Sequence, residues 1–537
     1  MTISLLIVLF FIILNLAAGS IVSPNTFSDR EQFTLAGRSL TGFILFASMA
    51  ATNFSAFTVF GLSGAGYRIG WAYYPAMAFG TGFMALSFIV LGIPMHRLSK
   101  TYKWISPAQF IEARYKSGLL AKLYSFLILV ITIPYVAIQA RSGGLLLQSV
   151  SGIPFPVGTA MVAALVMLYV LRGGMKSVAY TDFLQLVILV VLSVFAFTII
   201  GFGMQKAGID GRFASLQARD GVNNSFPFVS YLSTMVLWFL ADPMFPQLFQ
   251  RFFSARNEKA LVKTAALYPI ITGLLFFMTI GTGVFGSVLV EGLSPSESDQ
   301  VFMHAASKAG GPVLAVVLSL AGLAALLSTM DSQLLSVSTI SVEAFLPNRL
   351  RTVRVERLMV VGISVFAYLE ALFPIKTILD FLSSTAFPAY AVIAPLFYVG
   401  LYTNRIGKKS AFLALFIGIL LVLLELNGWK PFILPNVVFN LMIQIVILVC
   451  GALLFDRQDS KSDVVISLGT VVSPKQLIVF IIIFLISIDF WNYGKQAQLL
   501  VGIPGFVWYS LVLCIVLSVA LWVQFKNYRN DAGAVKG

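Results

Sequence analysis

The sequence of 537 residues is 58% hydrophobic and 11% charged with a mean hydropathy of +0.92, which excludes a water-soluble protein and is typical of a membrane protein with many spans. The two cysteines lie in apolar stretches and there are only two histidines, so a disulfide framework, a metal site of these residues and an enzyme active site are not expected. The net charge of +14 is distributed as in a membrane topology signal, not as in a nucleic-acid-binding surface.

Apolar stretches long enough to cross a bilayer recur along the whole chain and predict an all-α membrane protein with about 15 spans. The expected spans cover residues 2–22, 41–66, 70–95, 120–148, 155–171, 178–204, 228–250, 264–290, 312–342, 356–374, 379–402, 410–427, 432–454, 476–493 and 503–525. Lys and Arg gather in alternate loops, which predicts an outside N-terminus and a cytoplasmic C-terminus. We therefore expect a multi-pass protein of the plasma membrane, in bacteria the inner membrane, in contact with the lipid bilayer.

The first span, residues 2–22, has two interpretations. Leu16 to Gly19 offers small residues for cleavage of a signal peptide, but no basic residues precede the apolar stretch. We favour a retained membrane helix.

Two spans contain residues that interrupt helices. Residues 47–66 are rich in small and polar types, and residues 238–250 contain Pro243 and Pro246. A broken backbone is tolerated at membrane depth only where it lines a cavity. If the N-terminal helix is set aside, these are the first and sixth spans, an offset that inverts the topology of the second half and is typical of secondary transporters. Close helix packing is the alternative explanation for either segment alone.

The third span of this core holds the one basic residue deep inside a span, Arg141, two positions after Gln139. A guanidinium is the usual partner of a carboxylate, and an unpaired one is costly in a membrane. We expect Arg141 to hold a carboxylate of a transported solute. The alternative is that it snorkels outward or pairs with a protein acid such as Asp242.

Oxygen-bearing side chains interrupt the apolar stretch 312–342. Residues 328–333 read Ser-Thr-Met-Asp-Ser-Gln, and at 100° per residue Ser328, Asp331 and Ser332 share one helix face. A carboxylate at the centre of a membrane helix costs roughly 2.5 to 3.5 kcal/mol on insertion scales, so it is expected to face the bundle interior. A stripe of hard oxygen ligands predicts a cation site.

Further motifs accompany these features. They are Gly37-Arg38-Ser39, Gly173-Gly174-Met175-Lys176-Ser177-Val178 with Thr181-Asp182 and Gln185, Gln247 with Gln250-Arg251-Phe252, and Leu327-Ser328-Thr329 with Ser332-Gln333-Leu334-Leu335. With them, residues 35 to 405 resemble the sodium/solute symporter family, which includes transporters of proline, pantothenate, sugars, sialic acid and monocarboxylates. The resemblance implies a LeuT-like fold: five-helix inverted repeats at 36–205 and 206–405, a peripheral helix and cytoplasmic link at 1–35, and peripheral helices at 406–537.

The resemblance also implies where the coupling ion, Na⁺, binds. The first sodium site would consist of the backbone carbonyls of Ala51, Phe54 and Ala325 and the hydroxyls of Ser328 and Thr329. An unwound helix frees carbonyl oxygens, and neighbouring hydroxyls complete the shell of a hard cation without a fixed charge.

Some family members hold a second sodium ion, and the matching positions here are Asp182, Ser328, Asp331 and Ser332. Asp331 departs from the serine-rich version of this site, and two carboxylates in one site cannot both stay ionised cheaply. Three interpretations stay open: a second sodium ion, an ion pair between one carboxylate and a basic residue such as Lys176, or a proton on one carboxylate.

The expected solute contacts gather around the two breaks. Asn53 and Ser55 lie at the first break, Gln139 lies in the third core span beside Arg141, and Trp238 precedes the second break. Some relatives carry a carboxylate where this chain has Asn53, so the negative charge near the first break is lower here.

Together, the broken helices and the resemblance predict a sodium-coupled symporter that imports a small organic solute by alternating access. The solute is expected to bear a carboxylate, as an organic acid or amino acid does, and no nucleic acid or protein partner is expected. Because one sodium ion moving with a monoanion carries no net charge, an anionic solute would favour a second sodium ion. A solute sensor with the same fold and a proton-coupled symporter are the alternatives.

Overall fold

The computed structural model of the protein is almost entirely helical. It describes residues 3–22, 27, 29–208, 211–217, 226–295, 297–373, 378–429, 436–454, 464–495 and 497–526. Within these ranges the strands are β1 (Leu499–Leu500) and β2 (Ile503–Pro504), which pair in an antiparallel hairpin. Residues 527–537, for which the sequence predicts a cytoplasmic position, lie outside the described residues.

The helices follow one another with short connections. The first part of the chain forms α1 (Ile3–Ile21), α2 (Arg30–Leu35), α3 (Gly42–Asn53), α4 (Leu62–Arg68), α5 (Tyr73–Phe83), α6 (Ala85–Ser87), α7 (Ile93–Tyr102), α8 (Pro107–Tyr115), α9 (Gly118–Ser151), α10 (Phe155–Ala207), α11 (Gly211–Leu216), α12 (Phe228–Ala241) and α13 (Pro246–Ser254). The second part forms α14 (Glu258–Leu289), α15 (Val301–Phe345), α16 (Val353–Ala371), α17 (Ile378–Phe381), α18 (Phe387–Ala391), α19 (Ala394–Tyr402), α20 (Lys408–Leu426), α21 (Asn436–Leu454), α22 (Pro474–Ser487) and α23 (Gly505–Phe525).

Single turns of other helix types join several of these helices. They are η1 (Ala36–Arg38), the π-helical η2 (Phe57–Gly61), η3 (Gly70–Ala72), the π-helical η4 (Phe88–Gly92), η5 (Asp242–Met244), η6 (Ser298–Gln300), η7 (Asn348–Leu350), the π-helical η8 (Leu382–Ala386), η9 (Leu468–Thr470) and η10 (Phe490–Asn492).

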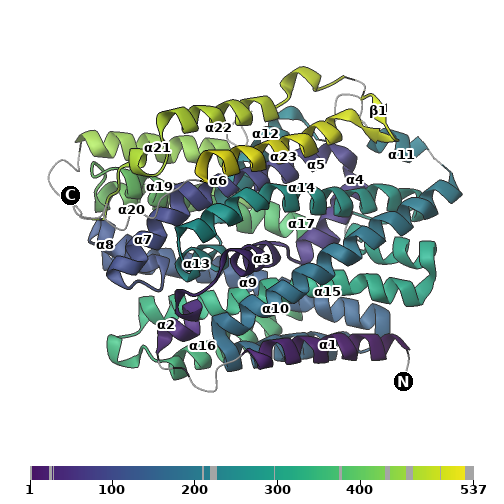
Figure 1. Cartoon of the computed structure of the whole chain (residues 1–537), viewed down its shortest axis with the longest axis horizontal. Helices are drawn as coiled ribbons and strands as arrows, with labels where there is room; N and C mark the ends of the chain where they lie inside the picture. Colours follow the sequence, from purple (N-terminus) through teal and green to yellow (C-terminus); the bar gives the residue numbers. More distant parts are fainter. Residues whose placement is uncertain are drawn as a thin grey trace.

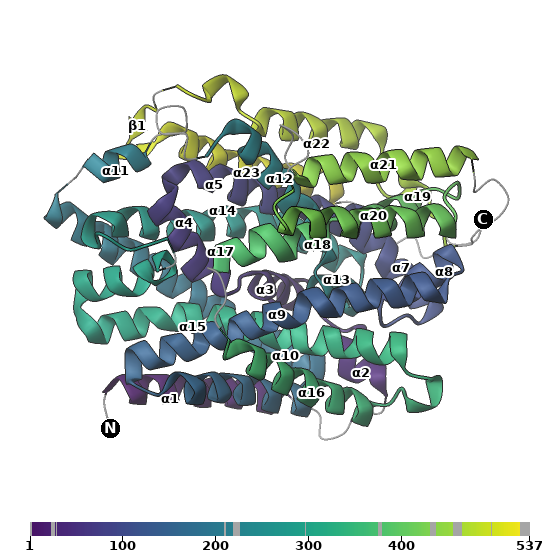
Figure 2. The ribbon, with the colours of Figure 1, turned by 180° about the vertical axis from the view of Figure 1, so that it is seen from behind.

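Most of the long helices lie along the longest dimension of the molecule (Figure 1). Helices α21 and α22 form one edge of the bundle and α1 and α16 the opposite edge, and the view from behind shows the same order (Figure 2). The core lies between these edges, where α10 packs on α15 and where α3 packs on α10, α14 and α15. This arrangement puts the interrupted helix α3 at the centre of the molecule.

The outer helices turn large apolar side chains away from the protein. Examples are Phe10 on α1, Phe416 on α20, Ile482 on α22 and Val519 on α23, all of them exposed. Exposure of such an apolar surface to water is unfavourable, so this surface is the one that faces the lipid bilayer.

Eleven helices among the described residues are long and apolar enough to cross a membrane, and two bent pairs raise the number to 13. The prediction of about 15 spans differs for two reasons. The predicted spans 155–171 and 178–204 both fall in α10, where Gly174 (φ 53°, ψ −147°) interrupts the helical backbone. Helix α16 has the required length but carries several charged side chains, namely Arg354, Glu356, Arg357 and Glu370.

Gly174 is required at this interruption for two reasons. Its positive φ is a conformation that side chains disfavour. In addition, a Cβ atom would lie 2.3 Å from the backbone oxygen of Phe33 on α2. The glycine at position 174 therefore lets α2 approach the interruption closely.

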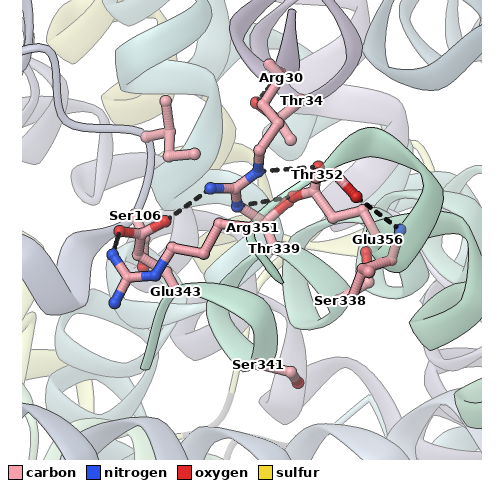
Figure 3. Close-up of polar contacts among 12 residues, drawn as sticks. Arg30, Thr34, Ser106, Ser338, Thr339, Ser341, Glu343, Arg351, Thr352 and Glu356 are labelled. Carbon is pink, nitrogen blue, oxygen red and sulfur yellow. Dashed lines mark hydrogen bonds and ion pairs between the residues drawn. The ribbon is translucent and has the colours of Figure 1, made fainter. Parts of the chain in front are cut away.

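An ion-pair network ties α2 to the ends of α15 and α16, and we call its residues Arg30, Glu343, Arg351 and Glu356 the α2 cluster (Figure 3). Arg30 Nη1 donates to Glu343 Oε2 at 2.9 Å, and Arg30 Nη2 donates to Glu356 Oε1 at 3.2 Å. Arg351 pairs with the other oxygen of Glu343, which also accepts from Gln109 Nε2 of α8. The cluster thus connects the segment before α3 to α15 and α16, and Gln109 adds a contact with α8.

Candidate ion and solute site

The first interrupted span is broken where the sequence predicts it. Helix α3 ends at Asn53, Phe54 is extended (φ −86°, ψ 94°), and the chain resumes as a helix at Phe57. The two halves, Gly42–Asn53 and Phe57–Arg68, are bent by 61°. Backbone carbonyls near the break therefore lack the partners that a continuous helix would supply.

The hydroxyl groups of α15 face the end of α3. Ser328 Oγ lies 2.9 Å from the carbonyl oxygen of Ala51 and 2.9 Å from that of Ala325. Thr329 Oγ1 donates to the carbonyl of Thr52 at 3.0 Å, and the side chains of Ser328 and Thr329 are fully buried. These hard oxygens include no carboxylate, which suits a monovalent cation.

Four of the five residues predicted for the first sodium site thus lie together: Ala51, Ala325, Ser328 and Thr329. The carbonyl of Thr52 joins them and was missed by the sequence analysis, although its place next to Ala51 at the end of α3 is the signal that could have indicated it. No hydrogen bond joins Phe54 to this group in the described part of the chain, so its place in the site stays a prediction.

Three of the positions predicted for a second sodium site, Asp182, Asp331 and Ser332, also lie together, since Thr52 Oγ1 is 3.3 Å from Asp182 Oδ2 and 2.9 Å from Ser332 Oγ. Ser332 Oγ donates to Asp331 Oδ1 at 2.9 Å, and Tyr169 of α10 donates to Asp331 Oδ2 at 2.7 Å. Asp182 Oδ2 accepts from Ser48 Oγ of α3 at 2.6 Å. All of these side chains except that of Tyr169, which is 2% exposed, are fully buried.

A basic residue reaches into this group, and it is Arg251 of α13. Its Nη2 lies 3.1 Å from Asp182 Oδ2 and 2.6 Å from Ser332 Oγ, and its side chain is fully buried. The sequence analysis named Lys176 as the example of a basic partner, but the residue that pairs with Asp182 is Arg251. The motif Gln250-Arg251-Phe252 held the signal, because a cation inside a mostly apolar helix needs an anionic partner.

The second broken span forms a small cavity against the first. Helices α12 and α13 are bent by 53° at η5, where Asp242 and Pro243 interrupt the helix. The cavity has a volume of about 10 Å³, and Asn53, Trp238 and Asp242 are among the residues that line it. Two of the predicted solute residues, Asn53 and Trp238, therefore face the same space.

Two other predicted solute residues support the first break. Gln139 Oε1 of α9 accepts a hydrogen bond from the backbone nitrogen of Ala56 at 3.1 Å. Tyr135, one turn earlier on α9, donates to Ser55 Oγ at 3.1 Å. The contact with Gln139 satisfies a backbone nitrogen at the interruption, and both contacts join α9 to the break.

Arg141 does not join the other predicted solute residues. It donates to the carbonyl oxygens of Ala371 at 2.9 Å and Phe373 at 3.1 Å, at the end of α16. The physical reason is its position two residues after Gln139, because two residues turn a helix by about 200° and point their side chains to opposite sides. The expectation that Arg141 meets the solute beside Gln139 therefore has no support in its contacts, and neither does its pairing with Asp242.

A larger cavity of about 600 Å³ lies nearer one end of the bundle. Its lining includes Phe60, Ser142, Asp299, His304 and Val316, from η2, α9, η6 and α15. Phe60 lies one helical turn after Phe57, which lines the small cavity. The two cavities are therefore neighbours along the second half of the broken span.

Comparison with known proteins agrees with this geometry. The sequence pattern described as "Sodium:solute symporter family" matches residues 33–418, which is more than half of the chain. The chain belongs to the sodium:solute symporter family. The predicted family is thereby confirmed.

Two similar proteins are named as sodium symporters. The chain is 26% identical over 444 residues to the sodium/pantothenate symporter of Escherichia coli (strain K12), covering 78% of this chain and 90% of that protein. It is also 26% identical over 458 residues to a sodium/proline symporter of Staphylococcus aureus, covering 81% of this chain and 88% of that protein. Sodium is accordingly the coupling ion of this symporter.

Solved structures agree on the fold. A Na⁺-coupled sialic acid symporter in a substrate-bound outward-open state superposes with a TM-score of 0.71 at 19% identity, over 85% of this chain and 98% of that one. Mhp1, a nucleobase-cation-symport-1 family transporter, superposes with a TM-score of 0.53 at 13% identity, over 96% of this chain and 99% of that one. The symporter is thus a multi-pass membrane protein with the predicted LeuT-like fold.

Proposed function

We propose that this family member imports a small organic solute together with sodium, and that its sodium ion binds between α3 and α15. The observation that carries the proposal is the approach of Ser328 and Thr329 to the carbonyls of Ala51 and Thr52. A sodium ion at this position would be held by oxygens from two helices. Its binding would therefore favour the conformation in which the two helices stay together.

Alternating access follows from the placement of the breaks. We assign residues 36–205 and 206–405 to two inverted repeats, so that the breaks in the first and sixth core spans face each other across the small cavity. The contact between Asn53 and Asp242, one from each break, supports this assignment: Asn53 Nδ2 lies 3.3 Å from Asp242 Oδ2. Motion of one repeat against the other would expose the cavity to each side in turn.

The group around Asp182 has a different role in this proposal. Arg251 supplies a fixed positive charge next to Asp182 and Ser332, where the resemblance implies a second sodium ion. The hydroxyls of Tyr169 and Ser332 donate to Asp331 and offset its negative charge. We therefore assign this group to holding α3, α10, α13 and α15 together, and one sodium ion to each transport cycle.

Proton coupling is the second candidate, and one observation favours it. Oxygen Oδ1 of Asp182 is buried and has no hydrogen-bond partner among the described residues, so it could carry a proton. A sensor without transport differs from both candidates because it binds solute but moves none.

Uptake of labelled solutes into proteoliposomes separates these functions. An inward sodium gradient is expected to drive uptake, with a Hill coefficient for sodium near 1. A pH gradient in sodium-free buffer is expected to drive none. Uptake that follows the pH gradient alone would replace sodium coupling with proton coupling, and binding without uptake under either gradient would indicate a sensor.

A further inference from the structure

A buried carboxylate in the small cavity has no charged partner in the part of the chain that the structure describes. Asp242 stands on η5, at the break between α12 and α13, and its residue is 2% exposed. Among the described residues, no ion pair reaches it. Asp242 Oδ2 accepts a hydrogen bond from the neutral amide of Asn53, at 3.3 Å. A charge buried in this way is costly, so a cationic complement is expected whenever the carboxylate is ionised.

The hydrogen bonding of Asn53 keeps this carboxylate turned to the cavity. Asn53 Nδ2 also donates to the hydroxyl of Tyr268 at 2.7 Å, so Asn53 is fixed between α14 and Asp242. Asn53 comes directly after Thr52 in the chain, and the carbonyl oxygen of Thr52 belongs to the proposed sodium site. Only Asn53 would therefore lie between a solute at Asp242 and the end of α3, where we propose that sodium binds.

The walls of the cavity are mainly aromatic. The rings of Phe57 and Trp238 stack with centroids 5.5 Å apart, and Phe387 meets Trp238 edge-on at 4.6 Å. Phe245 stacks on Phe387 at 5.2 Å, and Tyr135 completes this side of the lining. Aromatic faces attract a cation through the ring quadrupole, and they do so best in a desolvated site.

We propose that Asp242 and this aromatic wall bind a cationic nitrogen of the solute, either a protonated amine or a quaternary ammonium group. The inference rests on the proposed function and names the chemical class of its solute. A second sodium ion fits this place less well, because a hard cation needs a full shell of oxygens, whereas most of the lining is ring carbon beside a few oxygens such as those of Thr58 and Thr81. A net anion would meet a like charge in a closed space, and a sugar would leave the charge of Asp242 uncompensated.

This solute class also agrees with the energetics of transport by one sodium ion. A cation that enters with one sodium ion moves two positive charges, each worth about 2.3 kcal/mol per 100 mV. The membrane potential therefore contributes to the driving force for uptake without a second sodium ion. In the described structure the cavity is too small for a solute, so the rings of Trp238 and Phe387 must move apart when one enters.

Binding to the purified full-length protein in nanodiscs tests the inference. Thermal stabilisation in sodium buffer is compared for choline, putrescine and L-prolinamide as cations, L-proline as a zwitterion, pantothenate and N-acetyl-L-proline as anions, and glucose as an uncharged solute. At least one solute with a cationic nitrogen is expected to raise Tm by several degrees, and neither the anions nor glucose are expected to do so. Stabilisation by the anions or glucose alone, or by none of the cationic solutes, would overturn the inference.

Variants then connect the response to Asp242. Asp242→Asn keeps the size of the side chain and an oxygen for Asn53, and it is expected to weaken binding of the stabilising cation at least tenfold while sodium binding changes less than threefold. Glu297→Gln removes the same charge at an exposed position and is expected to change neither. Unchanged cation binding in Asp242→Asn would contradict the inference.

The outcome for the proposed function can be read separately. If gradient-driven uptake of an anion or a sugar occurs in the wild type and persists in Asp242→Asn, sodium symport stands and the solute class is wrong. If cations bind through Asp242 but no sodium gradient drives uptake, the solute class stands and the proposed function fails.

Discussion

Ser328 and Thr329 are neighbours on α15, yet each reaches a different carbonyl of α3, those of Ala51 and Thr52. Successive residues of a helix point about 100° apart. Ser328 and Thr329 can therefore both contact α3 only because its end lies in front of both side chains. Each hydroxyl can turn its proton away and present a lone pair to a cation. The proposed sodium site therefore depends on two side chains whose removal changes no formal charge.

Replacing these hydroxyls is expected to weaken sodium binding. Ser328→Ala and Thr329→Val each remove one oxygen ligand, and we expect each to raise the sodium dissociation constant at least tenfold, about 1.4 kcal/mol. Binding of ²²Na⁺ to the purified protein measures this effect. Ser338→Ala serves as the control, because Ser338 is buried on the same helix but bonds to the carbonyl of Leu335. Equal sodium affinity in all variants would refute this placement of the site.

Removing the guanidinium of Arg251 is expected to destabilise the fold. Arg251→Gln leaves the carboxylate of Asp182 buried without its ionic partner, which typically costs about 3 to 5 kcal/mol. The expected result is a clear drop in Tm, measured in sodium-free detergent solution. Adding Asp182→Asn to this variant removes the unpaired charge and is expected to recover part of the loss. A double variant less stable than Arg251→Gln alone would argue against the ion pair.

At the scale of elements, the α2 cluster connects the chain entering α3 to α15 and α16. Arg30 is the common member, since it donates to both Glu343 and Glu356 (Figure 3). Asp29 caps α2 by accepting from the backbone of Gln32 at 2.8 Å, so the position of Arg30 is fixed by a short helix with its own cap. These ion pairs therefore hold the segment that leads into α3 against α15 and α16.

Arg30→Gln is therefore expected to loosen this end of the bundle. Hydrogen exchange measured by mass spectrometry should become several times faster in α2 and in the first turn of α3. The exchange of α14 should stay unchanged. Arg349→Gln is the matched control, because Arg349 is exposed on the nearby η7. Identical exchange in the Arg30 and Arg349 variants would show that the cluster does not hold α2.

Much of this arrangement could be predicted from the sequence, because breaks and polar interruptions leave local signals. Prolines and small polar residues marked both broken spans, and Ser328 and Thr329 stood out from an apolar helix. The place of Arg251 in a mostly apolar helix indicates that it needs an anionic partner, but the sequence does not show which carboxylate lies at its depth, because Asp182 is far away along the chain. Arg141 was expected to hold a solute carboxylate because it is the one basic residue deep inside a span. Its contacts with the end of α16 could not be predicted, because they depend on which helix packs against that side of α9.

At the scale of the whole molecule, the helices form a bundle whose two ends face different sides of a membrane. The distribution of Lys and Arg predicts which end is cytoplasmic, and the fold alone does not decide it. Orientation is therefore the property of this symporter that depends most on charge in the loops.

Cysteine labelling can determine this orientation. In a variant without native cysteines (Cys450→Ser, Cys514→Ala), Glu297→Cys lies in a loop predicted outside and Lys103→Cys in a loop predicted in the cytoplasm. Both native positions are exposed. A membrane-impermeant maleimide is expected to label the first in intact cells and the second only after permeabilisation. The reverse pattern would contradict the predicted topology.

The central claim is that solute and sodium cross together and that sodium does so through the site of Ser328 and Thr329. Solute-stimulated uptake of ²²Na⁺ into proteoliposomes tests this claim most directly. We predict that a solute identified by thermal stabilisation increases ²²Na⁺ uptake by the wild type several-fold, and that the Ser328→Ala/Thr329→Val variant shows no such increase. The account would be contradicted if the solute did not change ²²Na⁺ uptake by the wild type, or if the solute still increased ²²Na⁺ uptake by the variant.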